Sequence, residues 1–296
     1  MTERSRRLLL DLGLFYAALI WGSTFFVVKG VLDDVHPLTL VSYRFLLSAA
    51  CMFPFAARKP LRRLAGEGMI LGLILMVLYA SQTVGLKYTT ASNSGFITGL
   101  FVLFVPLFLL VFFRTPPGKG QWCAVALAIG GLWILTGGLS HVNRGDVMTL
   151  LAAMTYAAHI LVTDRYVRRD ADPVLLAFHQ FWFCGLSCLL LGWLAGASFS
   201  VGTAKAAWVI VFLALFPNLS AFFIQILAQK HAPPLKVSLI FSLEPVFAAL
   251  FAWTVGGEAF SGRKAAGGLL ILAAMVLGEL SRLMPKKARE TEVLPV

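Results

Sequence analysis

The chain has 296 residues, of which 59% are apolar and only 13% are charged. Ordinary soluble domains carry roughly 45 to 50% apolar and about 25% charged residues, so this composition excludes a soluble globular protein and predicts a chain embedded in lipid. The net charge of +11 does not indicate nucleic-acid binding, because the cations fall in short segments beside apolar runs and form no contiguous basic stripe.

Ten apolar segments follow one another along the chain. A helix needs ~20 residues to cross a ~30 Å hydrocarbon core, so ten spans use about 200 residues and leave room only for short connections. Any substrate site must therefore lie among the helices themselves. We predict spans at residues 11–31, 37–57, 67–86, 93–113, 120–138, 145–165, 173–195, 206–229, 235–255 and 263–283.

The distribution of Lys and Arg predicts the orientation of these spans. With the N-terminus inside, eighteen of the 25 cations fall on the inner side, six fall on the outer side, and Arg44 remains inside the second span. The six outer cations are Lys29, Lys87, Arg144, Lys205, Arg263 and Lys264. Positive charge marks the cytoplasmic face, so both termini, including a short basic C-terminal tail, are predicted to be cytoplasmic.

The two halves of the chain resemble each other. Trp21 and Tyr156 match at an offset of 135 residues, and further pairs recur at offsets that drift up to 144. Because five spans is an odd number, a second copy must enter the membrane from the opposite side. We therefore expect an all-α integral membrane protein in which residues 1–144 and 145–296 form two inverted five-helix repeats around a central cavity, as in secondary transporters.

Several short motifs strengthen this interpretation: Ile20–Ser23 in the first span, then Ser242–Phe247, Gly257–Glu258 and Gly267–Gly268 in the second half. They resemble the EamA family of the drug/metabolite transporter superfamily, and within it bacterial amino-acid exporters of the YddG type. The resemblance implies efflux of aromatic amino acids and related amphipathic metabolites across the inner membrane. The first half departs from the family pattern, because the proline of its fourth span stands at Pro106.

Arg44 is the most unusual residue of the second span. A charge at the centre of a membrane helix costs ~2.5 to 3.5 kcal/mol on insertion scales, so Arg44 needs a partner. It either pairs with a substrate carboxylate in a water-filled cavity or bonds to neighbouring groups and locks helices together. The sequence leaves both alternatives open.

Three other spans carry polar and aromatic stripes that point to a shared cavity wall. In the sixth span Tyr156, His159 and Thr163 share one helix face. In the eighth span Asn218, Phe222, Gln225 and Gln229 recur at steps of four, three and four, and in the third span Tyr79, Gln82 and Thr83 form a shorter stripe. Such side chains often only join helices through hydrogen bonds worth ~0.6 kcal/mol. Our predicted substrate-binding residues are Trp21, Arg44, Tyr79, Gln82, Tyr156, His159, Asn218, Phe222 and Gln225.

Glu244 precedes Pro245, which removes a backbone donor and tends to break a helix. A carboxylate beside such a break could couple proton movement to transport, and His159 is the second candidate for that role. The alternative for Glu244 is a helix-terminal carboxylate that stabilises the helix dipole.

The favoured function is a secondary transporter with a small-molecule substrate and the lipid bilayer as its partners. No nucleotide-binding motif is found, so energy must come from gradients of substrate or protons. Other metabolite classes, such as a nucleobase, a sugar derivative or a drug, stay open as substrates. An intramembrane enzyme built on Arg44, His159 and Glu244, and a structural protein, are the competing classes. No catalytic residue, metal or cofactor is expected, and a monomer is one option for the oligomeric state.

Overall fold

The computed structural model describes residues 3–113, 118–138, 142–169, 171–231, 237 and 240–283, and these residues are helical apart from loops, turns and one isolated bridge between Val35 and Val201. The elements are α1 (Glu3–Lys29), α2 (Pro37–Ala56), α3 (Ala65–Gly85), α4 (Ala91–Gly99), α5 (Phe101–Phe113), α6 (Lys119–Thr136), α7 (Arg144–Val167), α8 (Pro173–Leu194), α9 (Ala204–Leu213), the π-helix η2 (Ala214–Ala221), α10 (Phe222–His231), α12 (Glu244–Thr254) and α13 (Gly262–Leu283).

Seven helical stretches among the described residues are long and apolar enough to cross a membrane. They are Leu9–Lys29, Pro37–Ala56, Ala65–Gly85, Ala91–Phe108, Arg144–Val167, Pro173–Leu194 and Ala204–Lys230. The chain is therefore a helical, multi-pass membrane protein. The other three predicted spans coincide with α6, α12 and α13, which are helical but not among the seven, so the ten-span arrangement stays a prediction. The start of the ninth predicted span and the basic tail lie outside the described residues.

Local sequence signals set where most helices begin. Thr90, Asn143 and Thr203 each accept a hydrogen bond from a backbone amide in the first turn of α4, α7 and α9, which satisfies a donor that would otherwise be unpaired. Proline occupies the first turn of α2, α8 and α12, where no backbone N–H is needed. These caps and prolines fix where the six helices begin.

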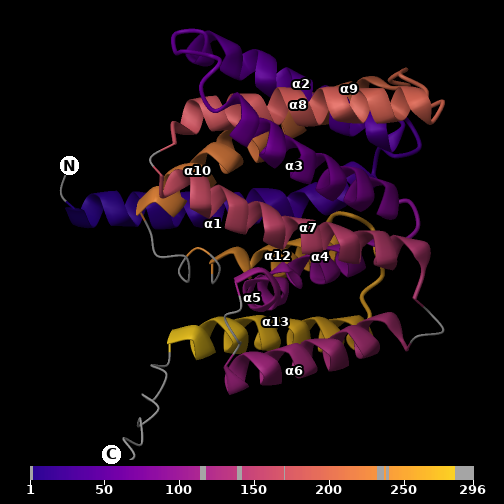
Figure 1. Ribbon diagram of the computed structural model, residues 1–296. Coiled ribbons are helices and arrows are strands. Elements are labelled where there is room, and N and C mark those ends of the chain that lie inside the picture. Colours follow the sequence, from indigo (N-terminus) through magenta and orange to yellow (C-terminus); the bar gives the residue numbers. More distant parts are fainter. Residues whose placement is uncertain are drawn as a thin grey trace, which may run out of the picture.

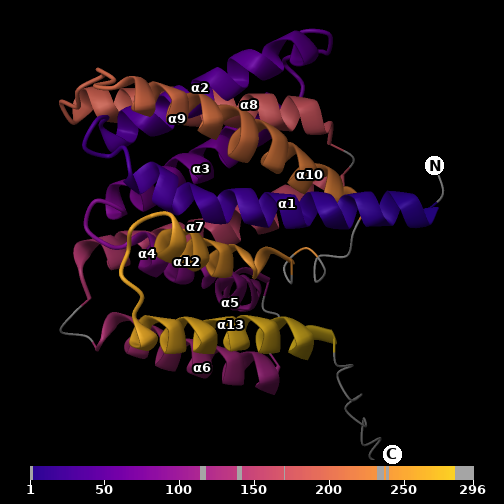
Figure 2. The ribbon, with the colours of Figure 1, turned by 180° about the vertical axis from the view of Figure 1, so that it is seen from behind.

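The helices stack in layers (Figure 1). The pair α2 and α8 lies at one edge of the stack, the pair α6 and α13 lies at the other, and α1, α3, α7, α4 and α12 fill the space between them. Helix α1 packs against α12, α3 packs against both α7 and α8, and α4 packs against α12 and α7. The first turns of α1 and the last turns of α13 lie at the same end of the molecule (Figures 1 and 2).

Two helices are interrupted near the middle of the molecule. Helix α4 ends at Gly99 and α5 begins at Phe101, so the break precedes Pro106, which lies inside α5. In the second half a turn at Ser242–Leu243 precedes α12, whose first residue is Glu244. The break expected beside Pro245 is confirmed, and Glu244 consequently lies at a helix start inside the protein.

Candidate functional site

A small cavity lies between α1, α3, α7, α10 and the first turn of α12. Aromatic rings form most of its wall, and Thr24, Gln82 and Glu244 add polar groups. The space open to the centres of water molecules is about 20 Å³, which is room for about one water. The aromatic residues are Trp21, Phe25, Tyr79, Tyr156 and Phe222. An amino acid does not fit in this conformation, so substrate binding requires the helices to move apart.

Trp21 is the centre of the aromatic wall. Its ring centroid lies 5.2 Å from that of Phe222 and 6.3 Å from that of Tyr156, within the range of favourable ring pairs. Its indole Nε1 donates a hydrogen bond of 2.9 Å to the carbonyl oxygen of Pro217 in the π-helix. Trp21 and Tyr156, which the sequence offset placed at equivalent positions of the two halves, therefore contact each other.

Among the described residues of the cavity wall Glu244 alone is acidic, and it is 5% exposed. Its carboxyl group interacts with the Tyr156 side chain, while its Oε2 atom makes no hydrogen bond to any described residue. Gly22 permits this arrangement, because a Cβ atom there would lie 2.5 Å from the Cβ of Phe247 and 2.8 Å from the carbonyl oxygen of Glu244. One carboxyl oxygen of this wall residue thus has unused hydrogen-bonding capacity.

Arg44 is fully buried but is not part of the cavity wall. Its Nε and Nη2 atoms donate hydrogen bonds of 3.1 and 2.5 Å to Oδ1 of Asn218. Its guanidinium lies 4.8 Å from the ring centroid of Tyr79, a cation–π distance. These contacts join α2, α3 and the π-helix, as in the helix-locking alternative for Arg44.

A group of buried polar side chains lies beside the cavity, between α7, α8 and α10. His159 Nε2 is 3.0 Å from Gln180 Oε1, and the His159 ring is 5.8 Å from that of Phe222. Both polar atoms of the Gln225 amide and the hydroxyl of Thr163 are buried with no partner among the described residues. The inward orientation expected for this face of α7 is confirmed by the burial of its three stripe residues. Unpaired buried groups of this kind are usually hydrated.

The predicted site residues fall into two sets. Trp21, Tyr79, Gln82, Tyr156 and Phe222 line the cavity together with Glu244. Arg44, His159, Asn218 and Gln225 are buried but do not line it. The sequence interpretation missed Thr24, Phe25 and Leu78. Thr24 and Phe25 lie three and four residues after Trp21, so helix periodicity would have placed them on its face. The sequence gives no reason to place Leu78 on the cavity wall, because an apolar residue in an apolar helix can face lipid, protein or a cavity equally well.

Polar contacts join neighbouring elements at the end of the molecule away from the first turns of α1 and the last turns of α13. Lys29 Nζ donates hydrogen bonds of 2.8 and 2.7 Å to the carbonyl oxygens of Leu86 and Thr89. The Glu258 carboxylate accepts hydrogen bonds from the backbone N–H of Ala91 and from Ser92 Oγ, the latter at 2.6 Å. These contacts tie α1, α4 and the connection after α12 together.

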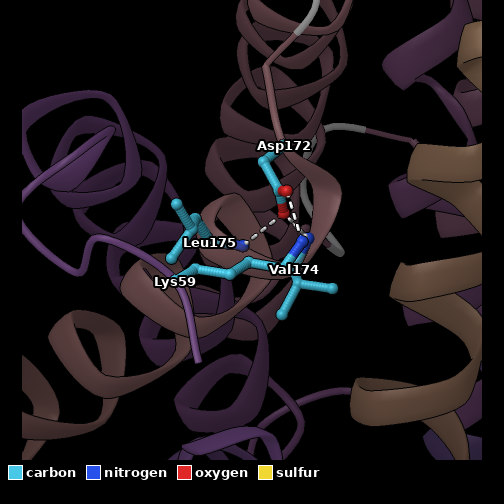
Figure 3. A network of polar contacts seen from close by, with 4 residues as sticks. All are labelled: Lys59, Asp172, Val174 and Leu175. Carbon is cyan, nitrogen blue, oxygen red and sulfur yellow. Dashed lines mark hydrogen bonds and ion pairs between the residues drawn. The ribbon is translucent and has the colours of Figure 1, made fainter. Parts of the chain in front are cut away.

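The other end carries an ion pair between Lys59 and Asp172 (Figure 3). Asp172 also caps α8, because its Oδ1 accepts hydrogen bonds of 2.9 and 3.2 Å from the backbone N–H groups of Val174 and Leu175. Partial burial opposes the charged carboxylate, but Lys59 and the two backbone donors outweigh it and hold the pKa of Asp172 below its usual value.

These features define a helical membrane transporter. A model of the EamA-like transporter family matches the chain twice, at residues 8–137 and 143–278. The chain therefore belongs to the EamA-like transporter family.

Named relatives cover nearly the whole chain. It is 32% identical to an uncharacterised transporter of Archaeoglobus fulgidus, over 94% of this chain and 88% of the relative. It is 27% identical to the uncharacterised inner membrane transporter YedA of Escherichia coli, over 96% and 95%. It is 24% identical to a probable amino-acid metabolite efflux pump of Salmonella typhimurium, over 91% and 94%. One protein crystal structure shares the fold, with a TM-score of 0.66 and 18% identity over 93% of this chain and 99% of that chain.

Proposed function

We propose that the protein is a secondary transporter that exports small amphipathic metabolites, above all aromatic and related amino acids, across the bacterial inner membrane. The observation that carries this proposal is the buried cavity, whose wall combines aromatic rings with a carboxyl group and is built from helices of both halves of the chain. One relative is named a probable amino-acid metabolite efflux pump, which supports this substrate class.

The helix contacts support two inverted five-helix repeats divided near residues 144 and 145. The repeats pair α1 with α7, α2 with α8, α3 with the segment from α9 to α10, α4 and α5 with α12, and α6 with α13. When the members of each pair are exchanged, three contacts map onto themselves: α2 with α8, α4 with α12, and α6 with α13. The contact of α1 with α12 maps onto that of α7 with α4 and α5, and the contact of α3 with α7 maps onto that of α10 with α1. Repeats of this kind give a transporter two nearly equivalent conformations.

Alternating access is the mechanism that fits a closed central site. The Lys29 and Glu258 contacts hold the end opposite the chain ends closed, so the substrate would reach the cavity from the end that carries the Lys59–Asp172 pair. Movement of one repeat against the other would then break the first set of contacts and open the route outward. With the chain ends in the cytoplasm, this sequence of steps amounts to export.

Glu244 is the proposed group for coupling to protons, because it is a titratable side chain on the cavity wall. His159 is the second candidate, although it lies beside the cavity and bonds to Gln180. The alternatives are a different metabolite class as substrate and, less favoured because the relatives are transporters, an intramembrane enzyme.

The test is substrate flux in reconstituted vesicles. Purified protein in liposomes is expected to release preloaded radiolabelled phenylalanine faster than protein-free vesicles do. Tyr156→Ala should reduce this flux about tenfold, because it removes a ring and a hydroxyl from the cavity wall. Tyr88→Ala is the matched control, because Tyr88 is 52% exposed and lies outside the cavity. Equal release from vesicles with and without the protein would reject phenylalanine transport.

A further inference from the structure

Among the described residues on the cavity wall, Glu244 carries a carboxyl group and none is a Lys, Arg or His. Arg44 is the buried cation that the sequence suggested as a partner for a substrate carboxylate. It instead donates a hydrogen bond to Asn218 and makes a cation–π contact with the ring of Tyr79. The described part of the cavity wall therefore provides a carboxyl group without a cationic partner.

We propose that the substrate is recognised through a protonated amine, which binds Glu244 within the surrounding aromatic rings, and that a substrate carboxylate is not required. This inference rests on the proposed transport function and specifies which polar group of the substrate the site recognises.

The contacts of Glu244 favour an ammonium donor. The Oε2 atom has no partner among the described residues, and the side chain is 5% exposed, so a bound donor would satisfy a group that water reaches poorly. An ammonium has three N–H donors and no acceptor, so it suits a carboxyl oxygen that lacks a partner. The interaction is charge-assisted and therefore stronger than one between neutral groups.

The rings around Glu244 contribute to the same preference. Trp21, Tyr156 and Phe222 are in mutual contact through Trp21, and all three border the cavity with Glu244. Aromatic faces attract ammonium groups, and enclosures of aromatic side chains are used to bind organic cations. A carboxylate at the same place would meet the like charge of Glu244 and gain nothing from the rings.

Three compounds that share a phenylethyl group test the contributions of the amine and the carboxylate separately. Phenylalanine has both an amine and a carboxylate, 2-phenylethylamine has only the amine, and 3-phenylpropionate has only the carboxylate. Thermal denaturation of the purified full chain in detergent near neutral pH, with each compound titrated, gives the relative affinities. We expect 2-phenylethylamine to stabilise the protein at least as well as phenylalanine, and 3-phenylpropionate to give no shift.

Glu244→Gln keeps the size of the side chain and removes its charge, so it should weaken binding of 2-phenylethylamine about tenfold or more, as for the loss of one charge-assisted hydrogen bond. Glu67→Gln is the matched control, since Glu67 lies in the first turn of α3 away from the cavity. If Glu244→Gln does not fold, the three-compound comparison on the unaltered chain still decides.

The outcomes separate this inference from the proposed function. Stabilisation by 3-phenylpropionate but not by the amine, or by none of the three compounds, would overturn amine recognition. Phenylalanine flux that 2-phenylethylamine does not inhibit would also overturn it and leave transport intact. Stabilisation by the amine without any phenylalanine flux would support amine recognition and reject amino-acid export.

Discussion

At the scale of single residues, the structure distinguishes the buried polar side chains that line the cavity from those that only join helices, whereas the sequence predicted both as one set. The stripes on α3, α7 and α10 predicted which side chains point inward, because a polar group in an apolar helix must avoid lipid. Periodicity does not tell which of two buried neighbours reaches the cavity and which bonds to another helix. Tyr79 does both, since it borders the cavity and contacts Arg44.

Arg44 allows a test of the locking role. Arg44→Lys keeps a positive charge but cannot reproduce the paired donors that reach Asn218. We expect it to lower the free energy of unfolding by about 1.5 to 3 kcal/mol, the range for a hydrogen bond to a charged group, and to lower the melting temperature in detergent accordingly. Ligand-induced stabilisation should persist.

The opposite pattern would contradict this role. A variant with the melting temperature of the unaltered chain and no response to phenylalanine would mean that Arg44 contacts the substrate. Arg168→Lys is the matched control, because Arg168 forms an exposed pair with Asp164, and such pairs contribute little to stability.

At the scale of elements, the apolar segments of the sequence predicted the helices well. The predicted span at 145–165 corresponds to α7 at Arg144–Val167, and that at 173–195 corresponds to α8 at Pro173–Leu194. The break between α4 and α5 and the π-helix were not predicted. A proline lies in each of these segments, Pro106 in α5 and Pro217 in the π-helix, but a proline alone does not tell whether a helix bends, breaks or widens.

The start of α8 gives a prediction about pH. Because the folded pKa of Asp172 is lowered, its ion pair stabilises the protein at neutral pH, and the stabilisation is lost as the pH falls through that folded value. Asp172→Asn should lower stability by less than about 1 kcal/mol at pH 7, since both partners are partly exposed. The difference should shrink below about pH 4.

Asp172→Ala is the companion variant. It removes the cap of α8 together with the ion pair, so it should cost about 1 kcal/mol more than Asp172→Asn. Thermal denaturation of the three proteins across pH 3 to 7 is the measurement. A constant gap between the unaltered chain and Asp172→Asn over that range would contradict a contribution from the charged pair.

At the scale of the whole molecule, the distribution of Lys and Arg predicts which end of the protein faces the cytoplasm. The first turns of α1 and the last turns of α13 lie at one end of the stack (Figure 2), as an even number of spans requires. Cysteine substituted at Arg58 or Ser200 tests the sidedness. We expect an impermeant thiol reagent added outside intact cells to label Ser200→Cys but not Arg58→Cys, because the basic α2–α3 connection should face the cytoplasm.

Two controls make that labelling interpretable. Inside-out vesicles should reverse the pattern, and the four natural cysteines should first be replaced, since Cys123 is exposed. Labelling of Arg58→Cys from outside intact cells would place the basic connections in the wrong compartment and reject the orientation.

The narrowness of the cavity affects the membrane that holds the protein. Protons cross a bilayer along unbroken files of water, and this cavity, with space for about one water, does not provide one by itself. We therefore expect the idle protein to be electrically tight, so that a cell could hold many copies without draining the ion gradients that power its other pumps.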